Sequence, residues 1–185
     1  FQYPFYKDEI LPIGNLREGK SSAKRADIIV VTKCPDNLSQ KDKQLFLTSL
    51  NPLEKQKVFF SSLTYLRKIK SDSEEIDIDI LKDDSFILVT GIADSSYLVN
   101  FLKLKGLDFK HLKYSDHYNF NKSSIDKISE LSSNKKILTT EKDFGRLNPK
   151  IKNRDLFYIE VGLKFPKEIN DLDFNNYIEE YINKD

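Results

Sequence analysis

A string of eight residues near the start of the chain has the letters of a phosphate-binding loop. Gly14 to Ser21 reads GNLREGKS and matches G-x-x-x-x-G-K-[ST]. In a working loop of this kind, backbone N–H groups surround the phosphates of a nucleotide, the lysine contacts them and the hydroxyl binds Mg²⁺. Taken alone, the string predicts a self-contained nucleotide-binding protein.

The residues on either side of this string do not supply what phosphate binding requires. The loop must leave a buried strand and open a helix whose N–H groups point at the anion. The upstream residues 7–13 (KDEILPI) are charged and contain a proline, and only residues 22–27 separate Ser21 from the next predicted strand. A crossover helix needs about ten residues or more. We therefore interpret the match as a coincidence within a basic loop.

A histidine beside an acid is the second candidate site. Asp116 and His117 follow a strand predicted over residues 109–114, and open α/β sheets bind ligands at the carboxyl ends of their strands. A histidine oriented by a carboxylate is suited to proton transfer near neutral pH. A lone histidine is more often structural, and Asp116 suits a turn or a cap equally well. We interpret His111 as an ordinary strand residue.

Polar residues also follow a strand predicted over residues 136–140. The run Thr140 to Asp143 (TEKD) predicts a capping box at a helix start, in which the Asp143 carboxylate reaches back to the N–H of Thr140. That structural role is our preferred interpretation of Thr140 and Asp143. Glu141 and Lys142 lie at the same strand end, where they either face a phosphate or a hydroxyl or are only solvated.

The elements that must position these residues alternate between strands and helices. The β-branched run 28–31 predicts a strand buried on both faces. A helix capped by Asn37 or Ser39 and running to Leu50 follows, and the strand 57–63 completes a βαβ unit. Residues 1–25 are interpreted as an ordered loop with a short helix, and residues 67–84 as an excursion or an edge hairpin.

The remaining elements continue this alternation. We predict, in order, the strand 85–93, a helix 94–105, the strand 109–114, a helix 123–131, the strands 136–140 and 155–165, and a helix 172–183. Such alternation implies an open, mostly parallel β-sheet with helices on both faces, a three-layer α/β/α fold. The length of 185 residues predicts a single domain over 1–185.

Composition excludes several classes of function. Lys and Arg number 30 against 29 Asp and Glu, which gives a net charge of +1 and does not favour nucleic acid. The single cysteine, Cys34, fits a reducing, intracellular compartment. No segment approaches the roughly 18–20 apolar residues that a membrane-spanning helix requires. The chain contains no methionine, so we expect a fragment or a processed chain.

Four segments of the chain together resemble the tetraacyldisaccharide 4′-kinase family. They are LPIGNLREGKSSAKRADIIVVTK (11–33), VTGIAD (89–94), YSDHYNF (114–120) and ILTTEKDFGRL (137–147). They occur in the order of the family and cover nearly the whole chain. Two positions depart from it: Gly19 replaces a usual proline, which creates the phosphate-loop match, and Tyr118 replaces a common second histidine.

The resemblance implies an ATP- and Mg²⁺-dependent kinase of lipid A biosynthesis. The family transfers the γ-phosphate of ATP to the 4′-hydroxyl of a tetraacyldisaccharide 1-phosphate. Its P-loop, metal-binding acids and catalytic aspartate belong to an N-terminal half that would precede Phe1. We therefore expect this chain to resemble the C-terminal portion, to hold no metal ligand, to bind no nucleotide alone and to be inactive alone. The intact enzyme would lie peripherally on the cytoplasmic face of the inner membrane.

The resemblance also assigns roles to particular residues. It implicates His117, with the aspartate of the other half, in activating the sugar hydroxyl. Asp116 is a candidate to orient His117. It makes Arg17 and Glu18 candidates for lining the substrate cleft, where Arg17 is suited to bind a phosphate bidentately. Glu141 and Lys142 become candidates for the acceptor site. A non-catalytic α/β binding module that only shares this topology remains the alternative.

Overall fold

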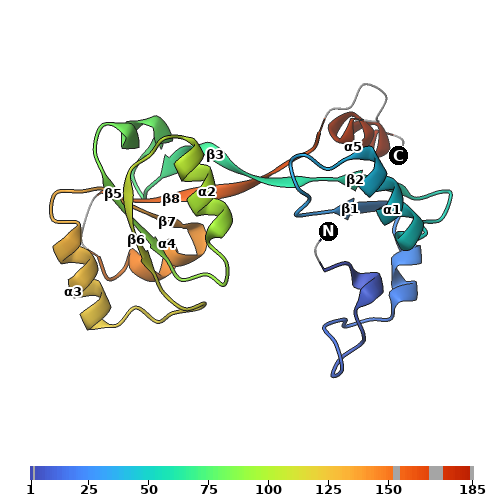
Figure 1. The fold of residues 1–185 in the computed structure, drawn as a ribbon, viewed down its shortest axis with the longest axis horizontal. Helices are drawn as coiled ribbons and strands as arrows, with labels where there is room; N and C mark the ends of the chain where they lie inside the picture. Colours follow the sequence, from blue (N-terminus) through green and yellow to red (C-terminus); the bar gives the residue numbers. More distant parts are fainter. Residues whose placement is uncertain (2, 152–154, 167–172, 184–185) are drawn as a thin grey trace. The chain divides into compact units, whose positions relative to one another are not determined.

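The chain folds into two compact units. The computed structural model describes residues 1, 3–151, 155–166 and 173–183. Unit 1 comprises residues 1–64 and 163–185, and unit 2 comprises residues 65–162. The strands β3 (Ser62–Lys70) and β8 (Leu156–Lys164) each continue from one unit into the other (Figure 1). From its length we predicted one domain, whereas contacts divide the chain into these two units.

Unit 1 contains the βαβ unit that the sequence predicts. The strands β1 (Ile28–Val31) and β2 (Lys57–Phe60) pair in parallel and are joined by α1 (Gln40–Leu50). Ser39 caps α1, because its hydroxyl oxygen accepts the N–H of Asp42 at 3.1 Å. This arrangement confirms the predicted βαβ unit and the Ser39 cap. The predicted strand 57–63 is divided, because β2 ends at Phe60 and β3 begins at Ser62.

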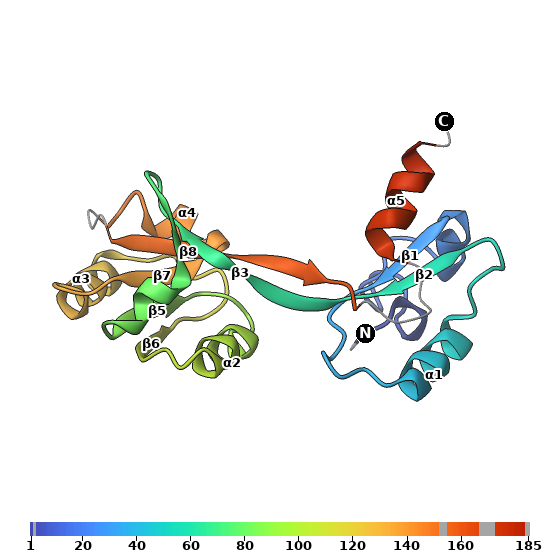
Figure 2. The ribbon, with the colours of Figure 1, turned by 90° about the horizontal axis from the view of Figure 1, so that it is seen from above.

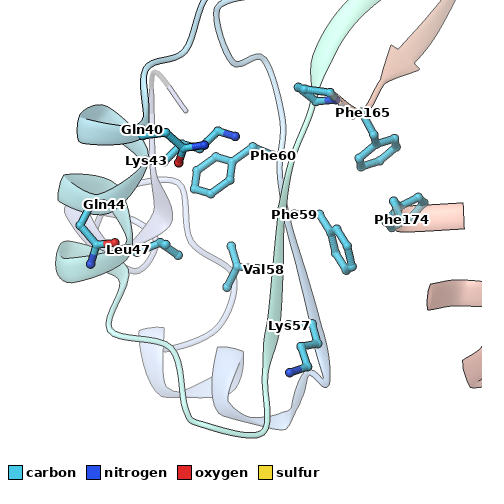
Figure 3. A pocket seen from close by; sticks show the side chains of 11 residues that line it. Gln40, Lys43, Gln44, Leu47, Lys57, Val58, Phe59, Phe60, Phe165 and Phe174 are labelled. Atoms are coloured by element: carbon cyan, nitrogen blue, oxygen red, sulfur yellow. The ribbon is translucent and has the colours of Figure 1, made fainter. Parts of the chain in front are cut away.

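Helices flank β2 on both sides. Phe60 points toward α1, where its ring centre lies 5.8 Å from that of Phe46, whereas Phe59 points toward Phe174 at 5.0 Å (Figure 3). Successive strand residues point to opposite faces, so α1 and α5 (Phe174–Ile182) pack on different faces of the strand. The predicted start of this last helix, Leu172, lies outside the described residues.

The sheet centred on unit 2 is mostly parallel. Its strand order is β4-β3-β8-β7-β5-β6. The bounds not yet given are β4 (Glu75–Asp77), β5 (Phe86–Thr90), β6 (Phe109–Lys113) and β7 (Ile137–Thr140). β5 pairs in parallel with β6 and β7, and β7 with β8, whereas β3 and β4 form an antiparallel pair. The fold class and the hairpin within residues 67–84 are confirmed.

Helices cover both faces of this sheet. The side chain of Leu88 in β5 packs in a cluster with Leu98 of α2 (Ser96–Leu104). Its neighbour Val89 belongs to a second cluster that includes residues of α3 (Lys122–Leu131) and α4 (Glu141–Leu147). In Figure 2, α2 and α4 accordingly lie on opposite sides of β5 and β7. Every residue of β5 is buried, which explains its continuous apolar run.

Two sequence-based expectations need refinement. In β1 only Val31 is buried and Val30 is 36% exposed, so the prediction of a strand buried on both faces is wrong for the described unit. The prediction took a β-branched run as a sign of burial, but β-branched residues also favour strands that are only partly buried. The N-terminal loop contains two short 3-10 helices, η1 (Phe5–Lys7) and η2 (Lys20–Arg25). None of the described helices is long and apolar enough to cross a membrane.

Candidate functional site

The candidate site lies where three neighbouring strands of unit 2 end. Gly91 follows β5, His117 follows β6 by a short turn, and Thr140 is the last residue of β7. The strands lie in the order β7-β5-β6 and run parallel. Their carboxyl ends therefore meet at one edge of the sheet, which is where open α/β sheets bind their ligands.

The backbone of His117 adopts a conformation that residues other than glycine seldom adopt. Its φ is +55°, in the left-handed region. Its N–H donates to the carbonyl oxygen of Gly91 at 3.0 Å and to Oδ1 of Asp116 at 3.0 Å. These bonds fix the backbone, while the side chain is 74% exposed. The ring is thus presented to solvent from an anchored position.

Asp116 contacts the turn more closely than the imidazole ring. Its Oδ1 accepts the backbone N–H of His117, whereas its Oδ2 lies 3.8 Å from Nε2 of the same residue. A distance of 3.8 Å is beyond hydrogen-bonding range. In this arrangement Asp116 stabilises the turn that carries His117, which is the structural role that the sequence also allowed.

Arg146 contacts the ring directly, and we did not single it out from the sequence. Its Nη2 lies 3.0 Å from Nδ1 of His117, and its Nη1 lies 3.2 Å from Oδ1 of Asp143. Arg146 follows Asp143 by three residues on α4, and residues three apart share a helix face. That spacing, at the end of ILTTEKDFGRL, is the signal that could have identified it.

The Asp143 carboxylate is completely buried and joins two strand ends. Its side chain is 0% exposed, and its Oδ2 accepts the N–H of Gly91 at 2.7 Å and the hydroxyl of Thr140 at 2.9 Å. The hydroxyl oxygen of Thr140 accepts the N–H of Asp143 at 3.2 Å, so the threonine half of the predicted capping box is confirmed. The other half is wrong. Thr140 is still paired with Ile159 within β7, and the carboxylate bonds instead to the Thr140 hydroxyl and to Gly91.

The structure places the other predicted site residues in two groups. Glu141 and Lys142 are the first two residues of α4, both exposed, at the same sheet edge as Asp116 and His117. Arg17 and Glu18 are exposed in the N-terminal loop of unit 1. Glu18 binds Arg25 there, with 2.6 Å between Oε2 and Nη2.

His111 is a structural histidine, in agreement with its interpretation as a strand residue. It lies in β6, and its Nε2 is 2.8 Å from the Thr90 hydroxyl at the end of β5. Burial lowers the pKa of the His111 imidazole, and the nearby charge of Lys113 lowers the pKa further. Both effects favour the neutral ring.

The string Gly14–Ser21 does not have the surroundings of a phosphate-binding loop. Upstream lies the short 3-10 helix η1, and Ile10 forms an isolated bridge with Leu16 inside the string. The string ends within the 3-10 helix η2, which starts at Lys20 and has six residues. Lys20 is turned to Glu9, with 3.1 Å between Nζ and Oε1. Without a strand before it and an α-helix after it, the string does not fit nucleotide phosphates.

A pocket in unit 1 lies elsewhere in the fold. It has a cavity volume of about 210 Å³ and is bordered by α1, β2, Phe165 and Phe174 (Figure 3). The Nζ atom of Lys43 lies 5.7 Å from the centre of the Phe60 ring on its wall. None of the residues singled out as catalytic or substrate-binding lines this pocket. We therefore locate the candidate chemistry by the strand ends and not by cavity size.

Comparisons with known proteins agree on one family. The sequence pattern described as tetraacyldisaccharide-1-P 4′-kinase matches residues 1–180. The tetraacyldisaccharide 4′-kinase of Flavobacterium psychrophilum is 37% identical over 182 residues, 96% of this chain and 51% of that protein. The enzyme of Flavobacterium johnsoniae is 34% identical over 177 residues, 95% of this chain and 52% of that protein. The chain thus spans about half the length of the curated relatives it matches.

A solved structure shares the fold. The crystal structure of LpxK from Aquifex aeolicus in complex with ATP superposes with a TM-score of 0.62 and 23% identity. The match covers 96% of this chain and 48% of that protein. At this level of identity the likeness establishes the architecture alone.

Proposed function

Because the chain belongs to the tetraacyldisaccharide-1-P 4′-kinase family, we propose that it forms the C-terminal portion of such a kinase. The enzyme would transfer the γ-phosphate of ATP to the 4′-hydroxyl of a tetraacyldisaccharide 1-phosphate in lipid A biosynthesis. The observation that carries the proposal is the exposed His117 ring, anchored at a strand end through Gly91 and Arg146.

His117 would act on the acceptor hydroxyl. Its ring is exposed and its backbone is held by two hydrogen bonds, so it can meet a substrate without reorganising. Asp116 would hold the turn. Glu141 and Lys142, at the same sheet edge, would face the polar groups of the acylated disaccharide. Arg17 and Glu18 would bind the substrate, as the family resemblance implies.

As the family resemblance implies, ATP and Mg²⁺ would bind to residues of an N-terminal half. The string Gly14–Ser21 lacks the required strand and helix. Within the part of the chain that the structure describes, no group of three or more His, Cys, Asp or Glu side chains is placed to hold a metal ion. As the family resemblance implies, the proposal includes an N-terminal half with a true P-loop as a partner, and a lipid substrate reached from the cytoplasmic membrane face.

The test compares this chain with a kinase that contains it. The chain alone, given MgATP and the disaccharide lipid, should give no turnover, and robust turnover would contradict a divided site. In the kinase, His117→Ala should lower kcat by about 10²-fold or more, the usual loss when a group that transfers a proton or donates a hydrogen bond in the transition state is removed. His111→Gln, which alters the structural histidine, is the matched control and should retain kcat. Unchanged kinetics in His117→Ala would remove His117 from the mechanism.

A further inference from the structure

Arg146 lies between a buried carboxylate and the exposed imidazole ring. We propose that Arg146 is a positioning residue that holds His117 in the tautomer with its hydrogen on Nε2. The ring would then offer an N–H donor at its exposed edge. This inference rests on the proposed function only for its relevance to the reaction, and the contacts that carry it are independent of any substrate.

The chemistry of the guanidinium determines the tautomer. Nη2 of Arg146 lies 3.0 Å from Nδ1 of His117. A guanidinium has five N–H donors, no acceptor, and stays protonated in proteins. Nδ1 must therefore accept this hydrogen bond through its lone pair. In a neutral imidazole with an unprotonated Nδ1, the hydrogen is on Nε2.

Arg146 is itself held by a rigid part of the sheet. Its other terminal nitrogen, Nη1, donates to Asp143, whose fully buried carboxylate is bound by Gly91 and Thr140. The Arg146 side chain is 29% exposed, against 74% for His117. A planar guanidinium that contacts two partners loses its freedom to rotate. The buried Asp143 carboxylate thus holds Arg146, and Arg146 in turn holds the exposed ring of His117.

Gly91 is linked to His117 twice, directly through the backbone and indirectly through Asp143 and Arg146 to the ring. Its carbonyl oxygen accepts the His117 N–H, and its own N–H binds the Asp143 carboxylate that holds Arg146. The two connections close a loop of contacts: Gly91, His117, Arg146 and Asp143. An exposed side chain within such a loop has one preferred orientation, which a solvated histidine lacks.

The tautomer has a consequence for the reaction. With its hydrogen on Nε2, His117 can orient an acceptor such as a carboxylate or a sugar oxygen, and it cannot first remove a proton at that nitrogen. Proton uptake would have to occur at Nδ1. That would break the bond to Arg146, because a protonated Nδ1 has no lone pair to accept it. His117 would therefore enter the reaction as a hydrogen-bond donor.

Ring-nitrogen NMR of the ¹⁵N-labelled chain tests the inference, because the chain has only two histidines. At a pH where the rings are neutral, we expect His117 to show an unprotonated Nδ1 and a protonated Nε2. In Arg146→Met, which keeps an aliphatic stem without donors, the Nδ1 resonance should shift toward the protonated range. Arg146→Lys should reverse only part of that shift, because a single ammonium group cannot bind the Asp143 carboxylate and the His117 ring at the same time.

The controls keep the inference separable from folding and from kinase activity. Arg67→Met removes an exposed arginine of the same unit and should leave both histidines unchanged, and His111 should not respond to Arg146→Met. A protonated Nδ1 in the parent chain would overturn the inference, whether or not the variants fold, and so would identical His117 spectra in the parent and in Arg146→Met. No turnover is measured, so failure of the proposed kinase function would leave this result standing, and the reverse also holds.

Discussion

The backbone N–H of Gly91 lies 2.7 Å from the Oδ2 atom of Asp143, a residue 52 positions later in the chain. Because the carboxylate is fully buried, it depends on this bond and on those from Thr140 and Arg146. Asp143→Ala leaves these donors unpaired and should lower the free energy of unfolding by about 3 kcal/mol. Urea denaturation of the parent and the variant measures this difference in the free energy of unfolding. Asp126→Ala, at an exposed position of α3, should change stability by at most about 0.5 kcal/mol, and equal effects of the two changes would contradict the role of Asp143.

Two glycines near the site should respond to alanine in opposite ways. A Cβ atom at Gly91 would lie 3.0 Å from Oδ1 of Asp143 and 3.5 Å from Phe120, whereas nothing lies within 4 Å of one at Gly145. Gly91→Ala should therefore destabilise the chain. Gly145→Ala should stabilise α4 by about 0.5–1 kcal/mol, because alanine favours the helix. Thermal unfolding of both variants checks this, and stabilisation by Gly91→Ala would refute the close packing.

Because the backbone at position 117 is left-handed, two substitutions that both remove the imidazole should differ in stability. Its φ of +55° costs a residue with a Cβ atom roughly 1–2 kcal/mol, a cost that glycine does not have. His117→Gly should therefore be more stable than His117→Ala by about 1 kcal/mol, although both lose the imidazole. A chemical unfolding series of the two variants measures the difference. If alanine proved the more stable, the strained conformation would be wrong.

Acid should destabilise the chain partly through His111. Burial lowers the pKa of its imidazole below the ordinary value of 6.5. The unfolded chain therefore binds more protons than the folded chain as the pH falls through that value, and the free energy of unfolding decreases. His111→Gln should reduce the loss of stability between about pH 8 and about pH 5.5. Denaturation of both proteins at the two pH values decides it, and identical losses would exclude His111.

MgATP should distinguish a coincidental sequence match from a working loop. Lys20 is paired with Glu9 and its string lacks a flanking strand and α-helix. Calorimetric titration of the parent chain and of Lys20→Ala should show weak or no binding in both. Micromolar binding by the parent that disappears in the variant would overturn our interpretation of Gly14–Ser21.

The sequence predicted the elements well because each rests on a local pattern. The apolar run of β5 and the Ser39 cap are readable within a few residues. The contact between His117 and Arg146 was not predictable in this way, because it joins positions 29 residues apart. It depends on β7 and β6 lying on either side of β5, and strand order is a property of the whole sheet. For the same reason the carboxylate of Asp143 bonds to Gly91 in place of its predicted partner.

The turn at Gly14 predicts which positions of the N-terminal loop a mutational scan would find sensitive. A Cβ atom there would lie 2.3 Å from the carbonyl oxygen of Glu9, so even alanine forces the turn apart. Lys20 makes one exposed ion pair, and such pairs contribute little. In a nucleotide-binding loop, the lysine is indispensable because it contacts the phosphates. Here a scan should find the glycine sensitive and the lysine tolerant, so that the ranking of the two positions identifies the loop without any ligand.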